Sequence, residues 1–119
     1  NKNIIEILIC HNRRVVSPLL IGSKNNIFTN FWGDTDENGF YKRSFDYLDI
    51  CTQKKKGIWS VPYVSGTILI NTSILNLVLK NWDLNSNLDF DMYLCKMIIT
   101  YYNLIYLVNN EIYGLILDN

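Results

Sequence analysis

Short strand-like runs alternate with segments of helical periodicity along this chain of 119 residues, and this alternation limits the possible folds more than any other feature. β-Branched and aromatic residues mark the strand-like runs at 15–20, 27–32, 58–64, 67–71 and 105–108. Helical spacing occurs at 4–9, 45–51, 72–79 and 90–101. The pattern predicts an α/β domain with a small mixed sheet flanked by helices.

The clearest predicted helix follows Asp89, whose carboxylate can accept hydrogen bonds from the first free N–H groups. Spacings of i, i+4 and i+7 or i+8 place its apolar residues on one expected core face: Phe90, Leu94, Met97, Ile98 and Tyr101. Two shorter helices have candidate caps in Ser44 and in Thr72 or Ser73.

Glycine, proline and polar residues mark the connections between these elements. Pro18 suits a strand that ends there or lies near a sheet edge. Residues 22–26 predict a turn, and the polar stretch 33–39 predicts an exposed, mobile loop. A further turn is expected at Asn109-Asn110.

Composition excludes several classes of protein. The 11 basic residues equal the 11 acidic ones, so the chain lacks the positive field of a nucleic-acid binder. No apolar run is long enough to cross a bilayer. Cys10, Cys51 and Cys95 lack metal-ligand spacing and are each expected to be buried thiols, and the single histidine, His11, cannot supply a two-histidine iron site. Heavy use of asparagine, isoleucine and lysine points to an A/T-rich genome, such as that of a large DNA virus or certain protists.

Several sequence blocks, in order along the chain, carry a resemblance to known proteins. They are Val16-Ser17-Pro18-Leu19-Leu20, Asn30-Phe31-Trp32-Gly33 with Tyr41-Lys42-Arg43-Ser44, Gly57-Ile58-Trp59-Ser60-Val61-Pro62-Tyr63, Asp89-Phe90-Asp91-Met92 with Cys95-Lys96, and Asn109-Asn110-Glu111. Together they resemble the accessory glycosyltransferase-like domain of procollagen lysyl hydroxylases and the matching part of the collagen galactosyltransferases. The resemblance covers almost the whole chain.

This resemblance implies a fold, a chemistry and a location. The fold would be the C-terminal part of a GT-A-like nucleotide-sugar transferase domain, with residues 1–119 as one partial domain. The complete domain would use a UDP-sugar and Mn²⁺ and act on collagen-like chains, in the endoplasmic reticulum lumen or in association with a virus. Its metal-binding Asp-x-Asp strand is expected upstream, so the chain alone should be inactive and should expose an apolar face that favours poor solubility or dimers.

Asp91 and Asp89 are the candidate catalytic residues, with Asp91 preferred. An inverting transferase needs a carboxylate to accept the proton of the acceptor hydroxyl, and a retaining one needs stabilisation of an oxocarbenium-like state. The alternative is that both carboxylates complement the helix dipole. Asp34 and Asp36 form a second Asp-x-Asp pattern, for which a solvated loop is the preferred interpretation.

Four other residues are candidates for substrate binding. Trp59 and Tyr63 have aromatic faces that can stack on a sugar or a peptide, although a core role is as plausible. The alternative role for Trp32 is packing. The alternative role for Asn30 is to satisfy backbone hydrogen-bonding groups at a bend. The expected ligand cleft lies at strand ends near Trp59, Tyr63 and Asp91.

Three classes of function remain open from the sequence. The chain would be a segment of a collagen-modifying glycosyltransferase, a noncatalytic accessory domain of a lysyl hydroxylase, or a module that binds collagen-like peptide. Its partners would be a collagen-like polypeptide and the rest of its own domain or a neighbouring hydroxylase domain. No residue set of its own is expected to bind a metal.

Overall fold

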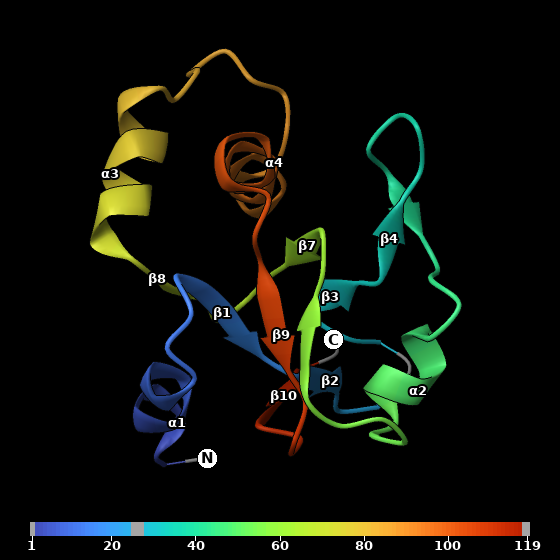
Figure 1. The fold of residues 1–119 in the computed structure, drawn as a ribbon. Coiled ribbons are helices and arrows are strands. Elements are labelled where there is room, and N and C mark those ends of the chain that lie inside the picture. Colours follow the sequence, from blue (N-terminus) through green and yellow to red (C-terminus); the bar gives the residue numbers. More distant parts are fainter. Residues whose placement is uncertain (1, 25–27, 118–119) are drawn as a thin grey trace.

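A four-stranded sheet lies at the centre of the computed structural model, which describes residues 2–24 and 28–117 (Figure 1). Its strands, in spatial order, are β6 (Ile58–Ser60), β9 (Tyr106–Val108), β1 (Val15–Pro18) and β8 (Leu69–Ile70). β1 and β9 are parallel, whereas β6 and β8 are antiparallel to their neighbours. The prediction of a small mixed sheet is confirmed.

Within the described residues, three two-stranded pairs extend this architecture. β2 (Leu20–Gly22) pairs in parallel with β10 (Gly114–Ile116), and antiparallel pairs form between β3 (Phe31–Trp32) and β7 (Tyr63–Val64) and between β4 (Asp34–Thr35) and β5 (Tyr41–Lys42). The predicted loop at 33–39 is largely exposed, as expected, but it also contains the two-residue strand β4 and the turn of a hairpin. Part of the predicted turn at 22–26 and the start of the run at 27–32 lie outside the described residues.

Pro18 ends β1, which lies inside the sheet rather than at its edge. The pairing of β1 with β8 stops at Val16, and the Leu19 N–H donates to the Val108 carbonyl across 2.8 Å on the opposite side. Because N–H groups alternate between the two sides of a strand, position 18 faces the side where β8 has already ended. The missing N–H of proline thus removes no bond from the sheet.

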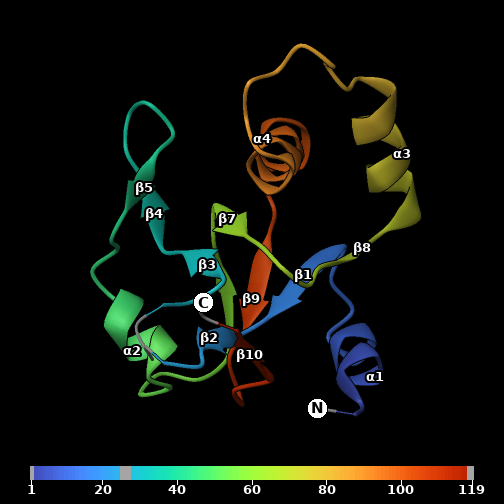
Figure 2. The same cartoon turned by 180° about the vertical axis from the view of Figure 1, so that it is seen from behind.

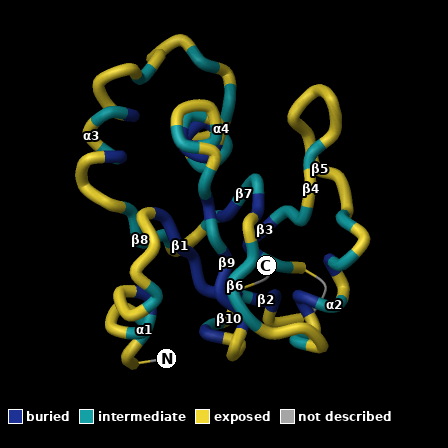
Figure 3. Tube along the Cα trace, viewed as in Figure 1, coloured by how far each residue is buried: buried dark blue, intermediate teal, exposed yellow. Residues whose placement is uncertain are grey.

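In residues 2–24 and 28–117, four helices surround the strands: α1 (Ile4–Cys10), α2 (Tyr47–Cys51), α3 (Thr72–Lys80) and α4 (Phe90–Tyr102). α3 and α4 lie together at one end of the central sheet, and α1 and α2 lie toward the other end on opposite sides (Figures 1 and 2). The β4–β5 hairpin projects beside α4 in both views. Burial is concentrated in the central strands, whereas the hairpin tip and outer helix surfaces are exposed (Figure 3).

The caps of the shorter helices differ from the prediction. Asn71 is the N-cap of α3, and its side-chain oxygen accepts from the Ser73 N–H across 2.9 Å, so neither Thr72 nor Ser73 is the cap. α2 begins later than expected, with Asp46 rather than Ser44 at its N-cap position. Asparagine, serine and threonine are all good N-cap residues, so the sequence alone did not distinguish Asn71 from Thr72 or Ser73.

The predicted core face of α4 is only partly correct. Leu94 and Ile98 are buried, but Phe90 is 62% exposed and Tyr101 is 48% exposed. Tyr93 and Cys95 are buried in addition. The buried stripe is rotated around α4 relative to the predicted face, because the helix packs on both α3 and β7. Trp82, in the connection between α3 and α4, also packs against Tyr93, with ring centroids 4.4 Å apart.

The cysteines divide into two environments. Cys51 and Cys95 are buried as expected, whereas Cys10 is exposed at the end of α1, so the prediction for Cys10 is wrong. A helix this short buries only the residues that face β1, chiefly Leu8. Within the described part of the chain, no helix is both long and apolar enough to span a membrane.

Asn109, in the turn after β9, is completely buried and organises one end of the sheet. Its Oδ1 accepts from the Gly57 N–H at 2.8 Å and from the Trp59 indole N–H at 2.9 Å. Its Nδ2 donates to the carbonyls of Ile50 at 2.8 Å and Lys55 at 2.6 Å. One amide side chain therefore joins α2, the turn that contains Lys55 and Gly57, β6 and β9.

We expect Asn109→Ala to lower the free energy of unfolding by about 2–4 kcal/mol, because it leaves buried donors and acceptors without partners. Urea unfolding monitored by circular dichroism measures this loss. The control is Asn81→Ala, which removes one exposed bond to the Leu77 carbonyl and should change stability by about 0.5 kcal/mol or less. Equal effects of the two substitutions would contradict the role of Asn109.

Candidate functional site

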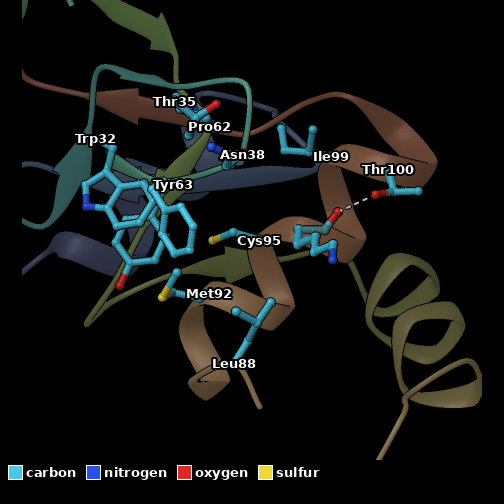
Figure 4. A pocket seen from close by; sticks show the side chains of 13 residues that line it. Trp32, Thr35, Asn38, Pro62, Tyr63, Leu88, Met92, Cys95, Ile99 and Thr100 are labelled. Carbon is cyan, nitrogen blue, oxygen red and sulfur yellow. Dashed lines mark hydrogen bonds between the residues drawn. The ribbon is translucent and has the colours of Figure 1, made fainter. Parts of the chain in front are cut away.

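A pocket of about 250 Å³ lies between α4 and the β4–β5 hairpin, at the ends of β3 and β7 (Figure 4). Trp32 and Tyr63 lie on one side of the pocket, and Ile99 and Thr100 of α4 lie on the other. The full lining comprises Trp32, Thr35, Asn38, Gly39, Phe40, Pro62, Tyr63, Leu88, Met92, Cys95, Lys96, Ile99 and Thr100. Aromatic and aliphatic side chains thus surround a few polar groups, as is typical of small-molecule sites.

Strand pairing brings the two aromatic residues together. Trp32 of β3 and Tyr63 of β7 are direct partners in the antiparallel register, and their rings stack with centroids 4.2 Å apart and planes 28° apart. Tyr41 of the hairpin meets Trp32 edge-on at 5.9 Å. Cross-strand aromatic pairs of this kind stabilise a short sheet, and here they also form one wall of the pocket.

Asn30 anchors this wall from inside the protein. It is 1% exposed, and its Oδ1 accepts from the Leu20 N–H at 2.8 Å. Its Nδ2 donates to the Pro18 carbonyl at 2.9 Å, and approaches Ser17 Oγ at 3.1 Å and the Ser65 carbonyl at 3.2 Å. This placement favours the structural alternative for Asn30, the satisfaction of backbone groups at a bend.

The two candidate catalytic carboxylates lie at the start of α4, on the side of Tyr63. Asp89 occupies the N-cap position, but its side chain makes no capping hydrogen bond, so the capping role expected for it is wrong. Asp91 is half-buried in the first turn of the helix. Burial raises the pKa of the Tyr63 phenol, a hydrogen bond with Ser65 opposes this, and the charges of Asp91 and Asp89 raise it further. Neither carboxylate lines the pocket, but both are chain neighbours of the lining residues Leu88 and Met92.

Cys95 lines the pocket from α4 and is almost completely buried. Its thiol donates to the Val64 carbonyl at 3.3 Å. Burial raises the pKa of this thiol to about 11, and the negative charge of Asp91 acts in the same direction. The thiol is thus neutral at physiological pH and serves as packing between α4 and β7.

Trp59, the remaining predicted site residue, does not line the pocket. It lies on β6, packs against the main core and donates its indole N–H to Asn109. Of the three residues expected around one cleft, only Tyr63 lines the pocket, whereas Trp59 lies elsewhere and Asp91 precedes the lining residue Met92 in the chain.

The contributions of α4 and of the hairpin to the pocket were not predicted from the sequence. Met92, Cys95, Lys96 and Ile99 follow i, i+3, i+4 and i+7 spacing, so a second stripe beside the core face was detectable. No sequence pattern indicated that Phe40 lines the pocket, because its position depends on a hairpin that was not predicted.

Asp34 and Asp36 belong to the hairpin rather than to the pocket lining. The Asp36 Oδ1 accepts from the N–H groups of Asn38 at 2.8 Å and Phe40 at 3.0 Å, so this carboxylate shapes the turn. Across residues 2–24 and 28–117, no group of three or more histidine, cysteine, aspartate or glutamate side chains is placed to hold a metal ion.

Gly33 connects Trp32 to the hairpin at a point of close approach. A Cβ atom at this position would overlap the Oγ of Ser44, whose hydroxyl is buried and has no hydrogen-bond partner among the described residues. Glycine therefore allows the two ends of the hairpin segment to pass each other.

The family model for the N-terminal domain of glycosyltransferase family 25 matches residues 1–118. This chain belongs to glycosyltransferase family 25. An uncharacterized protein of Acanthamoeba polyphaga mimivirus is 44% identical over 87% of the chain and 22% of its own length. Procollagen-lysine,2-oxoglutarate 5-dioxygenase 1 of Mus musculus is 38% identical over 98% of the chain.

A third relative combines two activities in its name. The multifunctional procollagen lysine hydroxylase and glycosyltransferase of Caenorhabditis elegans is 33% identical over 98% of the chain. The family 25 chain spans only 16% of this protein and of the mouse protein. It is thus homologous to one segment of much longer collagen-lysine-modifying proteins, as the resemblance predicted, and it also has a viral relative.

Four of the sequence blocks that carry the resemblance meet at or near β7, whereas the Asn109 block lies at one end of the central sheet. β3, from the Asn-Phe-Trp block, pairs with β7, and Ser17 of the first block donates to the Thr67 carbonyl at 2.7 Å, just beyond that strand. Cys95 of the helical block bonds to β7 through Val64. Residues far apart in the sequence thus build one structural unit that carries the pocket.

We expect Cys95 to react with iodoacetamide at pH 8 at least about 100-fold more slowly than Cys10. The raised pKa alone lowers its thiolate fraction about 100-fold, and burial slows access further. Peptide mapping by mass spectrometry measures the rates, with the urea-denatured protein as the control in which Cys95 should react readily. Equal rates in the folded protein would contradict the packing of α4 on β7.

Proposed function

We propose that this chain is part of a glycosyltransferase that transfers a sugar from a UDP-sugar to hydroxylysine of collagen-like polypeptides. We further propose that it forms the C-terminal part of a GT-A-like domain. One observation carries the proposal: Asp89 and Asp91, at the start of α4, are the chain neighbours of Leu88 and Met92, which line an aromatic pocket of a size suited to a small ligand. The family and the names of the collagen-lysine-modifying relatives support the choice of substrates.

The residues of the chain would contribute to transfer in two ways. Asp91 would accept the proton of the acceptor hydroxyl, or stabilise the positive charge that develops on the sugar ring, and Asp89 would assist electrostatically. Trp32 and Tyr63 would orient the substrate through apolar contact with its C–H groups. Trp59 and Asn30 would support the site from within the fold.

The described residues do not fit a manganese site, because they contain no group of three potential ligands. A divalent cation held by residues outside this chain would neutralise the departing diphosphate. The chain alone is accordingly proposed to be inactive, and Asp91 and Asp89 would act only within the complete protein.

A noncatalytic accessory domain of a lysyl hydroxylase is the second candidate. The name of the mouse relative, which describes a dioxygenase, favours it, because a hydroxylase needs no sugar transfer at this site. Binding of collagen-like peptide without catalysis would be compatible with the same pocket.

In the complete protein, we expect Asp91→Asn to lower sugar turnover about 100-fold or more, since a positioned acid–base group contributes roughly 10²–10⁴-fold. Release of UDP from a UDP-sugar, with a hydroxylysine peptide and Mn²⁺ present, measures the turnover. Activity without peptide provides the background.

The matched control is Asp83→Asn, in the exposed loop before α4. The Oδ1 of Asp83 accepts from the Asn85 N–H at 2.9 Å, and an asparagine oxygen can keep that bond. Turnover should be unchanged in this variant. Unchanged turnover in Asp91→Asn would refute the catalytic role, and absence of turnover in the parent protein would favour the accessory domain.

A further inference from the structure

We propose that Asn38, at the tip of the β4–β5 hairpin, is a site of spontaneous covalent modification, in which the Gly39 backbone nitrogen attacks its side-chain amide. Asn38-Gly39 is the only asparagine-glycine pair in the chain. Both residues are exposed, and both belong to the pocket lining (Figure 4). The modification therefore changes one wall of the pocket, whatever ligand that pocket takes.

The reaction needs only water and these two neighbouring residues, so it is intramolecular and has a high effective concentration. The Gly39 nitrogen loses its proton and forms a bond to Cγ of Asn38, while the bond from Cγ to Nδ2 breaks and ammonia leaves. Water then opens the resulting cyclic imide at one of its two carbonyls. One opening leaves aspartate at position 38. The other leaves isoaspartate, in which the main chain runs through the former side-chain carbon.

Gly39 leaves the ring closure unhindered. Its φ is +84°, and outside its chain neighbours no atom lies within 4 Å of the position that a Cβ would occupy. Its N–H donates to the Asp36 carbonyl at 3.0 Å, so this hydrogen bond must open before the nitrogen can attack. The strands of the hairpin have two residues each, and such a hairpin opens readily. The attack thus requires local opening of the tip and not unfolding of the domain.

A second turn of the chain provides an internal comparison. In the hairpin, the Asp36 Oδ1 accepts from the asparagine N–H at 2.8 Å, and the Asp36 carbonyl accepts from the glycine N–H at 3.0 Å. In the loop before α4, Asp83 makes the same two bonds, with the N–H groups of Asn85 at 2.9 Å and of Ser86 at 3.2 Å. Both asparagines are exposed. The two turns thus share their hydrogen bonds, but only the hairpin has a glycine as the attacking residue.

Isoaspartate disturbs the hairpin more than a new charge alone, because it inserts one more carbon into the main chain between positions 38 and 39. The Asp36 N–H donates to the Phe40 carbonyl at 2.9 Å, and the Phe40 N–H donates to the Asp36 Oδ1 at 3.0 Å. Both bonds span the inserted atom, so they cannot both keep their geometry. Phe40, a lining residue, is thereby displaced from its place in the pocket wall.

Aged samples of the full-length protein test the site. The protein is kept at mildly alkaline pH and physiological temperature, and peptide mapping by mass spectrometry follows the loss of each asparagine amide. We expect Asn38 to be lost at least about tenfold faster than Asn85, because Gly39 lacks the Cβ that hinders the attack. Isoaspartate methyltransferase should label position 38 in the same samples. Comparable rates at the two asparagines, or no isoaspartate at position 38, would overturn the proposal.

Two substitutions assign the loss to this chemistry. Ser86→Gly turns the comparison loop into a second asparagine-glycine pair, so it should raise the rate of Asn85 loss toward that of Asn38. Asn38→Gln should abolish the label at position 38, because the longer side chain must close a larger ring. An unchanged rate at Asn85 in the first variant would contradict the role given to glycine.

Hydrogen exchange followed by mass spectrometry measures the effect on the hairpin. The fragment that contains Asp36 and Phe40 should exchange faster in aged than in fresh protein. Freshly prepared Asn38→Asp, which adds the charge to a normal main chain, should exchange like the fresh parent. Unchanged exchange in aged protein that contains isoaspartate would refute the effect on the pocket wall. These readouts do not involve sugar turnover, so their outcome is independent of the proposed function.

Discussion

The buried amide of Asn30 is the interaction on which the rest of the site depends. It links the end of β1 and the start of β2 to the segment after β7, with bonds to Leu20, Pro18 and Ser65. The stretch from Pro18 to Leu20, the Asn30 segment and the segment after β7 are thereby held in one fixed relation. Since a buried amide without partners is costly, the segments can shift only if several hydrogen bonds break together. Asn30 and Ser65 flank β3 and β7, so this arrangement also positions the stacked rings of Trp32 and Tyr63.

Much of the architecture was predictable because it depends on local patterns. Strand runs at Val15, Ile58 and Tyr106 and helices after Asn3 and Asp89 follow from periodicity and residue type. The caps and the orientation of α4 were predicted less well. These depend on which neighbour a helix meets, and the packing of Trp82 on Tyr93 is a tertiary contact without a local signal.

The candidate site was predictable in part, for the same reason. Trp32 and Tyr63 stood out as aromatic residues in short, distinctive blocks, and strand pairing brings them together. Trp59 has equally distinctive neighbours in sequence, yet its indole is committed to Asn109. Phe40 joins the pocket only because residues 34–42 form a hairpin. Residue type identifies aromatic candidates for the site. Tertiary contacts, such as the bond between Trp59 and Asn109, then decide which of them line the pocket.

The two walls of the pocket differ in mechanical character. α4 rests on the core through Leu94, Cys95 and Ile98, whereas the hairpin consists of two-residue strands that leave the body of the protein at Gly33. A two-stranded hairpin has little stability of its own. Occupancy of the pocket should therefore narrow the motions of the hairpin while leaving the helix as it is. Affinity would then be set as much by the entropy lost in the hairpin as by direct attraction to the ligand. A change at Glu37, a tip residue outside the lining, could tune residence time without touching the ligand.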